Sequence, residues 1–229
     1  MPTNSAFDVE ARPSDSPLVE SVWRSTSGSD PGSFTSVAFS NWELVVTSHR
    51  GRTWVAIRGP ETVPTLAPVP EDAEFLGITF KHGAFMPDLP ARTLVDAPID
   101  LPDTSGPTFR LMGGAWHLPT FDNADTFVAS LVRERILVAD PVVQDTLRGK
   151  PQPLSPRSLQ RRFLRATGLT QATLLQIDRA RDAVDLLEQG TPILDAANQT
   201  GYADQSHLTR ALRRFWGYTP AQVLRGETR

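Results

Sequence analysis

Residues 191–220 read TPILDAANQTGYADQSHLTRALRRFWGYTP and determine the fold of the C-terminal half of the chain. Apolar residues within 193–200 predict a short helix, with Thr191 as N-cap and Pro192 at the first helical position. Gly201 ends that helix, because glycine tolerates the positive φ that a tight turn between two helices needs. The beginning of this stretch therefore predicts a helix followed by a tight turn.

A second helix is predicted over Gln205–Phe215, with Asp204 as its N-cap. Apolar residues recur at spacings of four and three and form the face that we expect to be buried, Leu208, Leu212 and Phe215. The opposite face carries amides, hydroxyls and arginines near a helix N-terminus, which contact base edges and phosphates in a DNA major groove. These side chains are Gln205, Ser206, Thr209, Arg210 and Arg213. Any amphipathic helix has a polar face, so this pattern alone also fits a purely structural pair of helices.

The order GYADQSHLTRALRRFWGYTP closely resembles the second helix-turn-helix of the AraC/XylS family of transcription regulators. The resemblance rests on the glycine-aromatic turn, the Asp-Gln-Ser-His-Leu-Thr-Arg run, the Arg-Arg-Phe at the helix end and the Gly-Tyr-Thr-Pro that follows. It implies a module that reads DNA. His207 could contact either the DNA backbone or the preceding helix, and we favour the structural role.

Residues 154–168, LSPRSLQRRFLRATG, repeat this pattern. Ser155 is the predicted N-cap, Pro156 occupies the first helical position and Gly168 ends the helix. Leu159, Phe163 and Leu164 form its apolar set, and its polar face offers Arg157, Gln160, Arg161 and Arg165. The pattern resembles the recognition helix of the first helix-turn-helix in the same family.

The segment before this helix departs from the family pattern. It reads DTLRGKPQP over 145–153, and Pro151 and Pro153 forbid a continuous helix. The supporting helix must then be Val142 to Leu147, joined through a longer turn. A long helix over 170–189, with Leu174, Ile177, Ala180, Val184 and Leu187 on one face, links the two units.

Two recognition helices on one rigid connector can enter successive major grooves, roughly 34 Å apart. The resemblance assigns base contacts to Arg157, Gln160 and Arg161 in the first unit and to Gln205, Ser206, Thr209 and Arg210 in the second. It assigns phosphate contacts to Arg165, Arg213 and Arg214.

Charge divides the chain. Residues 1–150 hold 12 Lys and Arg against 19 Asp and Glu, whereas residues 151–229 hold 11 against 7. This asymmetry suits one module that meets phosphates and one that does not. The chain has no cysteine, which excludes disulfides, zinc fingers of the cysteine type and thiol catalysis.

The acidic half holds 14 of the 20 prolines within residues 1–120, which favours short strands over long helices. Residues 34–39, 42–48, 53–58 and 74–80 read as strands, with a hairpin connection at 48–52. Residues 81–119 cannot be placed from their pattern. We therefore predict an α+β protein, with a small β-rich N-terminal domain followed by an all-α domain in which a long helix joins two helix-turn-helix units.

Seven aromatic residues of this half could line an apolar ligand pocket or form the ordinary core of a small sheet, and we favour the core for most of them: Trp23, Trp42, Trp54, Phe75, Phe80, Phe85 and Trp116. The histidines of this half, His49, His82 and His117, lie more than thirty residues apart, so no metal site is predicted. No nucleophile elbow or phosphate-binding loop is present, so we expect neither an enzyme nor a cofactor.

The N-terminal half resembles the β-rich domains that AraC-type regulators use for sensing or dimerisation. With the role that this resemblance implies, the predicted organisation is a disordered lead over residues 1–20, a sensor or dimerisation domain over 21–120, a linker helix over 121–140 and the double helix-turn-helix over 141–229. On the linker helix the apolar stripe of Phe127, Leu131 and Val138 could form a dimer contact or pack on its own domain.

The expected partner is double-stranded DNA. An unknown small-molecule effector, RNA polymerase and a second copy of the chain are further candidate partners. With no signal sequence and no apolar run that could span a membrane, we expect a cytoplasmic protein. The competing functions are a partner-binding protein whose helix pair has lost DNA binding and an enzyme with a DNA-binding tail.

Overall fold

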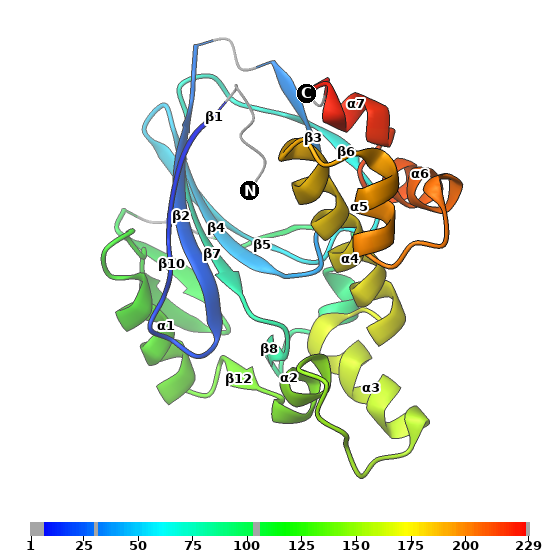
Figure 1. Cartoon of the computed structure of the whole chain (residues 1–229). Helices are drawn as coiled ribbons and strands as arrows, with labels where there is room; N and C mark the ends of the chain where they lie inside the picture. Colours follow the sequence, from blue (N-terminus) through cyan, green and yellow to red (C-terminus); the bar gives the residue numbers. More distant parts are fainter. Residues whose placement is uncertain (1–6, 30–31, 103–105, 228–229) are drawn as a thin grey trace.

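The computed structural model describes residues 7–29, 32–102 and 106–227. The N-terminal domain is built on a six-stranded antiparallel sheet with strand order β1-β2-β7-β4-β5-β9 (Figure 1). Its strands are β1 (Phe7–Arg12), β2 (Val19–Ser27), β7 (Glu74–Phe80), β4 (Glu43–His49), β5 (Arg52–Arg58) and β9 (Ile99–Asp100). Three two-stranded ladders flank this sheet: β3 (Ser33–Ser36) with β6 (Thr65–Pro68), β8 (Ala84–Phe85) with β12 (Val138–Ala139), and β10 (Thr108–Leu111) with β11 (Gly114–His117).

The central strands lie where their sequence pattern predicts them. The hairpin between β4 and β5 pairs His49 with Arg52. Arg50 and Gly51, the two residues between them, have φ values of 49° and 75°, as a tight two-residue hairpin turn requires. The predicted strand 34–39 is shorter in the structure, because β3 ends at Ser36 and the chain then turns toward the helical domain.

The prediction of a disordered lead over residues 1–20 is wrong for the described part of that segment; residues 1–6 lie outside the described ranges. β1 pairs with β2 along its whole length, from Phe7 opposite Ser27 to Arg12 opposite Val22. The Arg12 guanidinium also forms an ion pair with Asp125 at 2.8 Å. An edge strand is held by backbone hydrogen bonds to a neighbour that already exists, so it needs little apolar pattern of its own.

The predicted linker helix is also shorter than expected. Helix α1 spans Ala124–Arg133, and Arg135 then adopts a φ of 59° that ends the helical path. Phe127, Leu131 and the following Leu137 are buried in the core of the N-terminal domain. Val138 belongs to β12 and pairs with Phe85. The stripe of α1 therefore packs on its own domain, as one of the two alternatives proposed.

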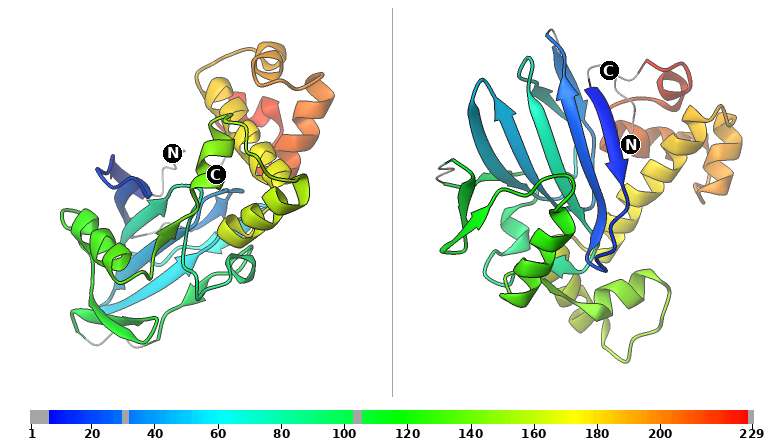
Figure 2. Two further views of the ribbon diagram at one scale, coloured as in Figure 1. Left: turned by 90° about the horizontal axis from the view of Figure 1, so that it is seen from below. Right: turned by 90° about the vertical axis from the view of Figure 1, so that its left-hand side faces the viewer.

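The C-terminal domain contains six helices in the described residues, which lie together on one side of the sheet (Figures 1 and 2). They are α2 (Pro141–Leu147), α3 (Pro156–Thr167), α4 (Gln171–Glu188), α5 (Ile193–Gln199), α6 (Gln205–Phe215) and α7 (Pro220–Leu224). None of the helices in the described ranges combines the length and the apolar character that crossing a lipid bilayer requires. The architecture confirms the predicted α+β fold.

Two apolar cores correspond to the two domains. The helical core also contains Ala38 and Phe85, which come from the N-terminal domain. Ala38 donates its backbone N–H to the carbonyl of Phe215 at 2.8 Å. The Thr35 and Tyr218 hydroxyls lie 2.9 Å apart. The two domains are thus packed together through shared apolar side chains and polar contacts.

Candidate nucleic-acid interface

The second helix-turn-helix, which we call the second reading unit, consists of α5, a tight turn and α6; the first reading unit is the helix-turn-helix that contains α3. Gly201 has a φ of 74°, and Tyr202 directly after it is buried, with its backbone N–H donating to the carbonyl of Ala197 at 2.9 Å. Asp204 caps α6 by accepting the backbone N–H of His207 at 2.6 Å. Helix α5 begins one residue later than predicted: its N-cap is Pro192, which has no side chain to accept a hydrogen bond.

The two faces of α6 are those that the sequence predicts. Leu208, Leu212 and Phe215 are buried, and the polar side chains on the other side, Gln205, Ser206, Arg210, Arg213 and Arg214, are exposed. Thr209 is half-buried, and its hydroxyl donates to the carbonyl of Gln205 at 2.8 Å. Its oxygen lone pairs and methyl group remain the parts that could face a base. The guanidinium of Arg214 lies over the ring of Phe215, 4.8 Å from its centroid.

His207 is exposed and packs edge-on against Tyr202, with ring centroids 5.1 Å apart and planes at 89°. This contact joins α6 to the turn before it. It supports the structural role for His207 over a contact with the DNA backbone.

The first reading unit pairs α2 with α3. The Ser155 hydroxyl accepts the backbone N–H of Ser158 at 3.2 Å, Pro156 is the first helical residue and Gly168 has a φ of 74° at the C-cap. All three features match the predicted boundaries. The supporting helix is α2, as predicted, and residues 148–155 connect it to α3.

The predicted DNA-contacting residues of α3, Arg157, Gln160, Arg161 and Arg165, are all exposed. Arg165 also places its guanidinium 5.2 Å from the ring centroid of Phe85 in the N-terminal domain. Phe163 is fully buried, whereas Leu164, which was expected on the apolar face, is 40% exposed. Leu164 precedes Arg165 and follows Phe163, so helical rotation places it between the buried and the solvent-facing sides.

Helix α4 connects the two units and buries the predicted stripe of Leu174, Ile177, Ala180, Val184 and Leu187. The hydroxyl of Thr170 caps it by accepting the backbone N–H of Thr173. This packing makes α4 the central helix of the domain, with α5, α6 and α7 against it. The polar face of α6 is therefore held on α4 by packing, whereas α3 is joined to α4 by residues 168–170.

Sequence reasoning missed the role of Arg162. Its guanidinium donates to both carboxylate oxygens of Asp140, at 3.1 and 2.9 Å, across the interface between α2 and α3. Asp140 followed by Pro141 is a recognisable helix start, but no local pattern indicates its partner on another helix.

His82 of the N-terminal half is linked to α4 through Ser40. His82 Nε2 lies 3.0 Å from the Ser40 hydroxyl, which in turn donates to Asp178. Burial lowers the pKa of His82, an effect that Asp178 partly offsets and Arg181 reinforces. The carboxylate here contacts the serine rather than the imidazole, and Ser40 is buried, so this cluster lacks the arrangement of a catalytic triad. Within the described ranges, no group of three or more His, Cys, Asp or Glu side chains is placed to hold a metal ion.

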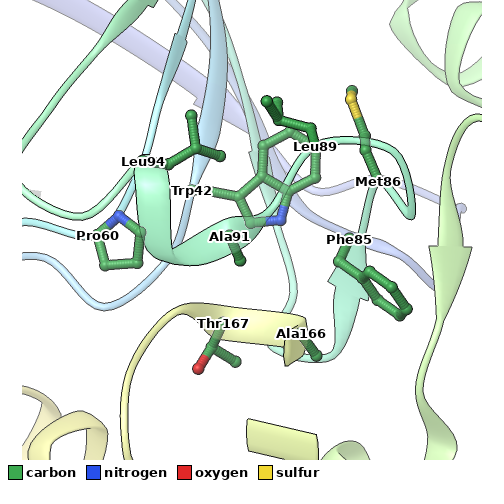
Figure 3. Close-up of a pocket in the computed structure, with 9 residues that line it drawn as sticks. All are labelled: Trp42, Pro60, Phe85, Met86, Leu89, Ala91, Leu94, Ala166 and Thr167. Atoms are coloured by element: carbon green, nitrogen blue, oxygen red, sulfur yellow. The ribbon is translucent and has the colours of Figure 1, made fainter. Parts of the chain in front are cut away.

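Among the seven aromatic residues considered above, Trp42, Phe80 and Phe85 are buried in the core and Trp116 packs against it, whereas Trp23, Trp54 and Phe75 are half-buried. Trp42 and Phe80 are buried and stack with ring centroids 3.9 Å apart. A small apolar cavity lies between Trp42, Phe85 and the C-terminal end of α3 at Ala166 and Thr167 (Figure 3). Its volume of about 10 Å³ is near the minimum that holds one water molecule. In this conformation the cavity has no room for an effector.

Comparison with known proteins places the C-terminal region in a family. Residues 153–226 match the family described as the helix-turn-helix domain. The HTH-type transcriptional regulator RipA of Corynebacterium glutamicum is 37% identical over 95 residues, which cover 41% of this chain and 29% of RipA. The uncharacterized HTH-type transcriptional regulator YbfI of Bacillus subtilis is 44% identical over 50 residues, which cover 22% of this chain and 18% of YbfI. This chain thus matches less than a third of the length of either relative.

Among solved structures, ToxT from Vibrio cholerae O395 aligns over 96% of this chain and 98% of its own, with a TM-score of 0.42 and 10% sequence identity. The capped helices, the exposed polar faces and the sequence match all indicate a helix-turn-helix domain in the C-terminal region. Residues 153–226 match the helix-turn-helix domain family, in agreement with their resemblance to the AraC/XylS regulators, and in this chain they follow a β-rich N-terminal domain.

Proposed function

We propose that this protein is a sequence-specific DNA-binding transcription regulator that reads two successive major grooves. One observation carries the proposal: α3 and α6, both capped and amphipathic, each present an exposed polar face and are attached to the same long helix, α4. The excess of Lys and Arg in residues 151–229 gives this module the sign of charge that DNA attracts.

We propose different roles for the exposed side chains. Arginine pairs well with guanine and glutamine with adenine, which suits base contacts for Arg157, Gln160 and Arg161 and for Gln205, Ser206, Thr209 and Arg210. Arg165, Arg213 and Arg214 lie closer to the C-terminal ends of their helices, where contact with the phosphate backbone is more natural.

The first test is footprinting of the whole protein on the DNA upstream of its own gene, at near-physiological salt because low salt exaggerates non-specific binding. Two protected patches one helical turn apart are expected. Absence of protection would favour a partner-binding protein that has lost DNA binding.

The second test separates base contacts from phosphate contacts. Arg210→Ala should cost about 1–3 kcal/mol at the cognate site and relax the preference at one base pair. Arg213→Ala should weaken binding to all sequences alike and reduce the slope of log affinity against log salt by about 1. Arg133→Ala removes an exposed arginine from the end of α1 and is the matched control, expected to leave binding unchanged. Equal losses on cognate and random DNA for Arg210→Ala and Arg213→Ala would refute the assignment of roles.

For the N-terminal domain we propose a regulatory role, exerted through its contacts with the helices. Ala38 binds the C-terminal end of α6, and Ser40 binds Asp178 on α4. A change in the N-terminal domain would therefore alter how the reading helices are presented. A thermal-shift screen with small molecules tests for an effector, and light scattering tests for a dimer; a monomer that no compound stabilises would contradict both forms of regulation.

A further inference from the structure

The two reading units are held together in different ways. In the second unit a short turn with the buried Tyr202 joins α5 directly to α6. In the first unit α2 ends at Leu147 and α3 begins at Pro156. Among the described residues, the backbone hydrogen bonds of this connection are local, such as the one from the Lys150 N–H to the Asp145 carbonyl at 2.9 Å. Pro151 and Pro153 have no backbone N–H to donate, and residues 148–155 separate the two helices, so contacts between α2 and α3 contribute to the angle between them.

Asp140 supplies one such contact. It is 5% exposed, and one of its carboxylate oxygens accepts the backbone N–H of Val142 at 3.0 Å, which caps α2. Both oxygens accept hydrogen bonds from the guanidinium of Arg162, in the middle of α3. The Asp140 side chain therefore caps the start of α2 and binds Arg162 on α3. A charge-assisted contact of this kind imposes a defined geometry as well as attraction.

The same residue is bound to the N-terminal domain. The Asp140 backbone N–H donates to the carbonyl of Gly83 at 2.7 Å, next to the ladder that pairs Ala84 with Ala139. Gly83 is confined: a Cβ there would lie 2.9 Å from the side chain of Gln144 on α2. Figure 1 shows β8, β12, α2 and α3 grouped at one end of the molecule.

Helix α3 meets the N-terminal domain at two further points. Arg165, one turn beyond Arg162, lies over Phe85 of β8. At the C-cap, an ideal Cβ on Gly168 would be only 2.6 Å from the carbonyl oxygen of Ala91, in the 3₁₀ helix η1 (Ala91–Thr93). The reading helix is thus docked on the N-terminal domain from its middle to its end.

We infer that Asp140 and Arg162 are positioning residues of the first reading unit, through which the N-terminal domain sets the orientation of α3 toward DNA. The inference rests on the proposed function. The matched family region begins at residue 153, so α2 and Asp140 lie outside it. The second unit, whose helices are joined by their own turn, does not depend on this pair.

The test compares footprints of full-length variants on a DNA site that wild type protects in two patches. Asp140→Asn keeps the acceptor that caps α2 but removes the charge that holds Arg162. Arg162→Ala removes the partner from a partly exposed position and leaves the cap intact. The matched control is Arg148→Ala, an exposed arginine whose ion-pair partner, Asp145, lies on its own helix α2.

Both variants are expected to lose the patch read by α3 while keeping the patch read by α6. Affinity for the two-patch site should fall by about tenfold or more, because linking two binding modules raises avidity by about 10²–10⁴. The double variant should be no weaker than the worse single variant, since both changes break one contact. Arg148→Ala should protect both patches.

Five outcomes decide the matter. Selective loss of the α3 patch supports the inference. If Arg162→Ala still protects both patches, the inference is overturned and the proposed function stands. Equal weakening of both patches together with a lowered melting temperature also overturns the inference, because it indicates a merely structural role for the pair. A wild type that protects only the α6 patch overturns the inference, and a wild type that protects none overturns the proposed function itself.

Discussion

Gly168→Ala tests whether the docking of α3 on the N-terminal domain stabilises the protein. Gly168 has a φ of 74°, where a side chain costs about 1–2 kcal/mol because Cβ approaches the following carbonyl. It is also confined, because an added Cβ would lie 2.6 Å from the Ala91 oxygen and 2.7 Å from Val95 Cγ2. Overpacking at such a site costs about a further 1–3 kcal/mol.

Gly201→Ala is the matched control. Gly201 also follows a helix of a reading unit and has the same φ of 74°, but within the described part of the chain no heavy atom beyond its chain neighbours lies within 4 Å of an added Cβ. The control therefore carries the conformational cost alone. We expect the free energy of unfolding to fall by about 1–2 kcal/mol in Gly201→Ala and by about 2–5 kcal/mol in Gly168→Ala.

Calorimetric melting of the two variants measures this difference. At about 2–4 °C for each kcal/mol in a chain of this size, Gly168→Ala should melt roughly 2–12 °C below Gly201→Ala. Equal melting temperatures would refute the reasoning, because they would mean that the contact of α3 with η1 contributes nothing to stability.

Two further predictions concern the N-terminal domain. Burial lowers the pKa of His82, so the folded protein favours the neutral imidazole; this contribution is complete above about pH 6.5, the ordinary pKa of histidine, and is lost as pH falls below it. Wild type should therefore lose more melting temperature between pH 7.5 and 5.5 than His82→Gln does, and equal losses would contradict this. Gly77→Ala should cost about 1–3 kcal/mol, because its Cβ would lie 2.0 Å from the Trp23 indole. Gly28→Ala should change the urea midpoint little, because among the described residues nothing beyond its chain neighbours lies within 4 Å of an added Cβ.

The helices of the reading units could be predicted to within a residue or two because their boundaries are encoded locally. Ser155 and Asp204 accept hydrogen bonds from the backbone three residues later, and the glycines at 168 and 201 take the left-handed conformation. Each of these signals involves only neighbours in the sequence. For α5, the prediction of Thr191 as N-cap was wrong and displaced the start of that helix by a single residue.

The rest of the fold depends on partners that are distant in sequence. Strand β1 exists because β2 offers an edge, and β12 exists because Val138 meets Phe85. The spacing of apolar residues could not show that α1 ends before Val138. The apolar residues beyond Arg133 continue the stripe, so the pattern alone predicts a longer helix. In the candidate site, the exposure of the α3 and α6 side chains followed from periodicity, whereas the pair Asp140–Arg162 joins two helices and left no periodic trace.

The contacts between domains bear unequally on the two reading units. The second unit receives a backbone hydrogen bond at the very end of α6, from Ala38 to Phe215, and its recognition residues lie at the other end of that helix. The first unit is held at the C-cap of α3, where Gly168 meets Ala91, and at the middle of α3, where Arg162 binds Asp140, whose backbone N–H in turn binds Gly83 of the N-terminal domain. Coupling free energy is reciprocal, so any DNA geometry that requires α3 to rotate must work against its contacts with the N-terminal domain, and any change at Asp140 must alter the affinity of the first unit. Under the proposed function, we therefore expect regulation to act mainly on whether the first reading unit contacts DNA, while the second reading unit stays bound to its half of the site.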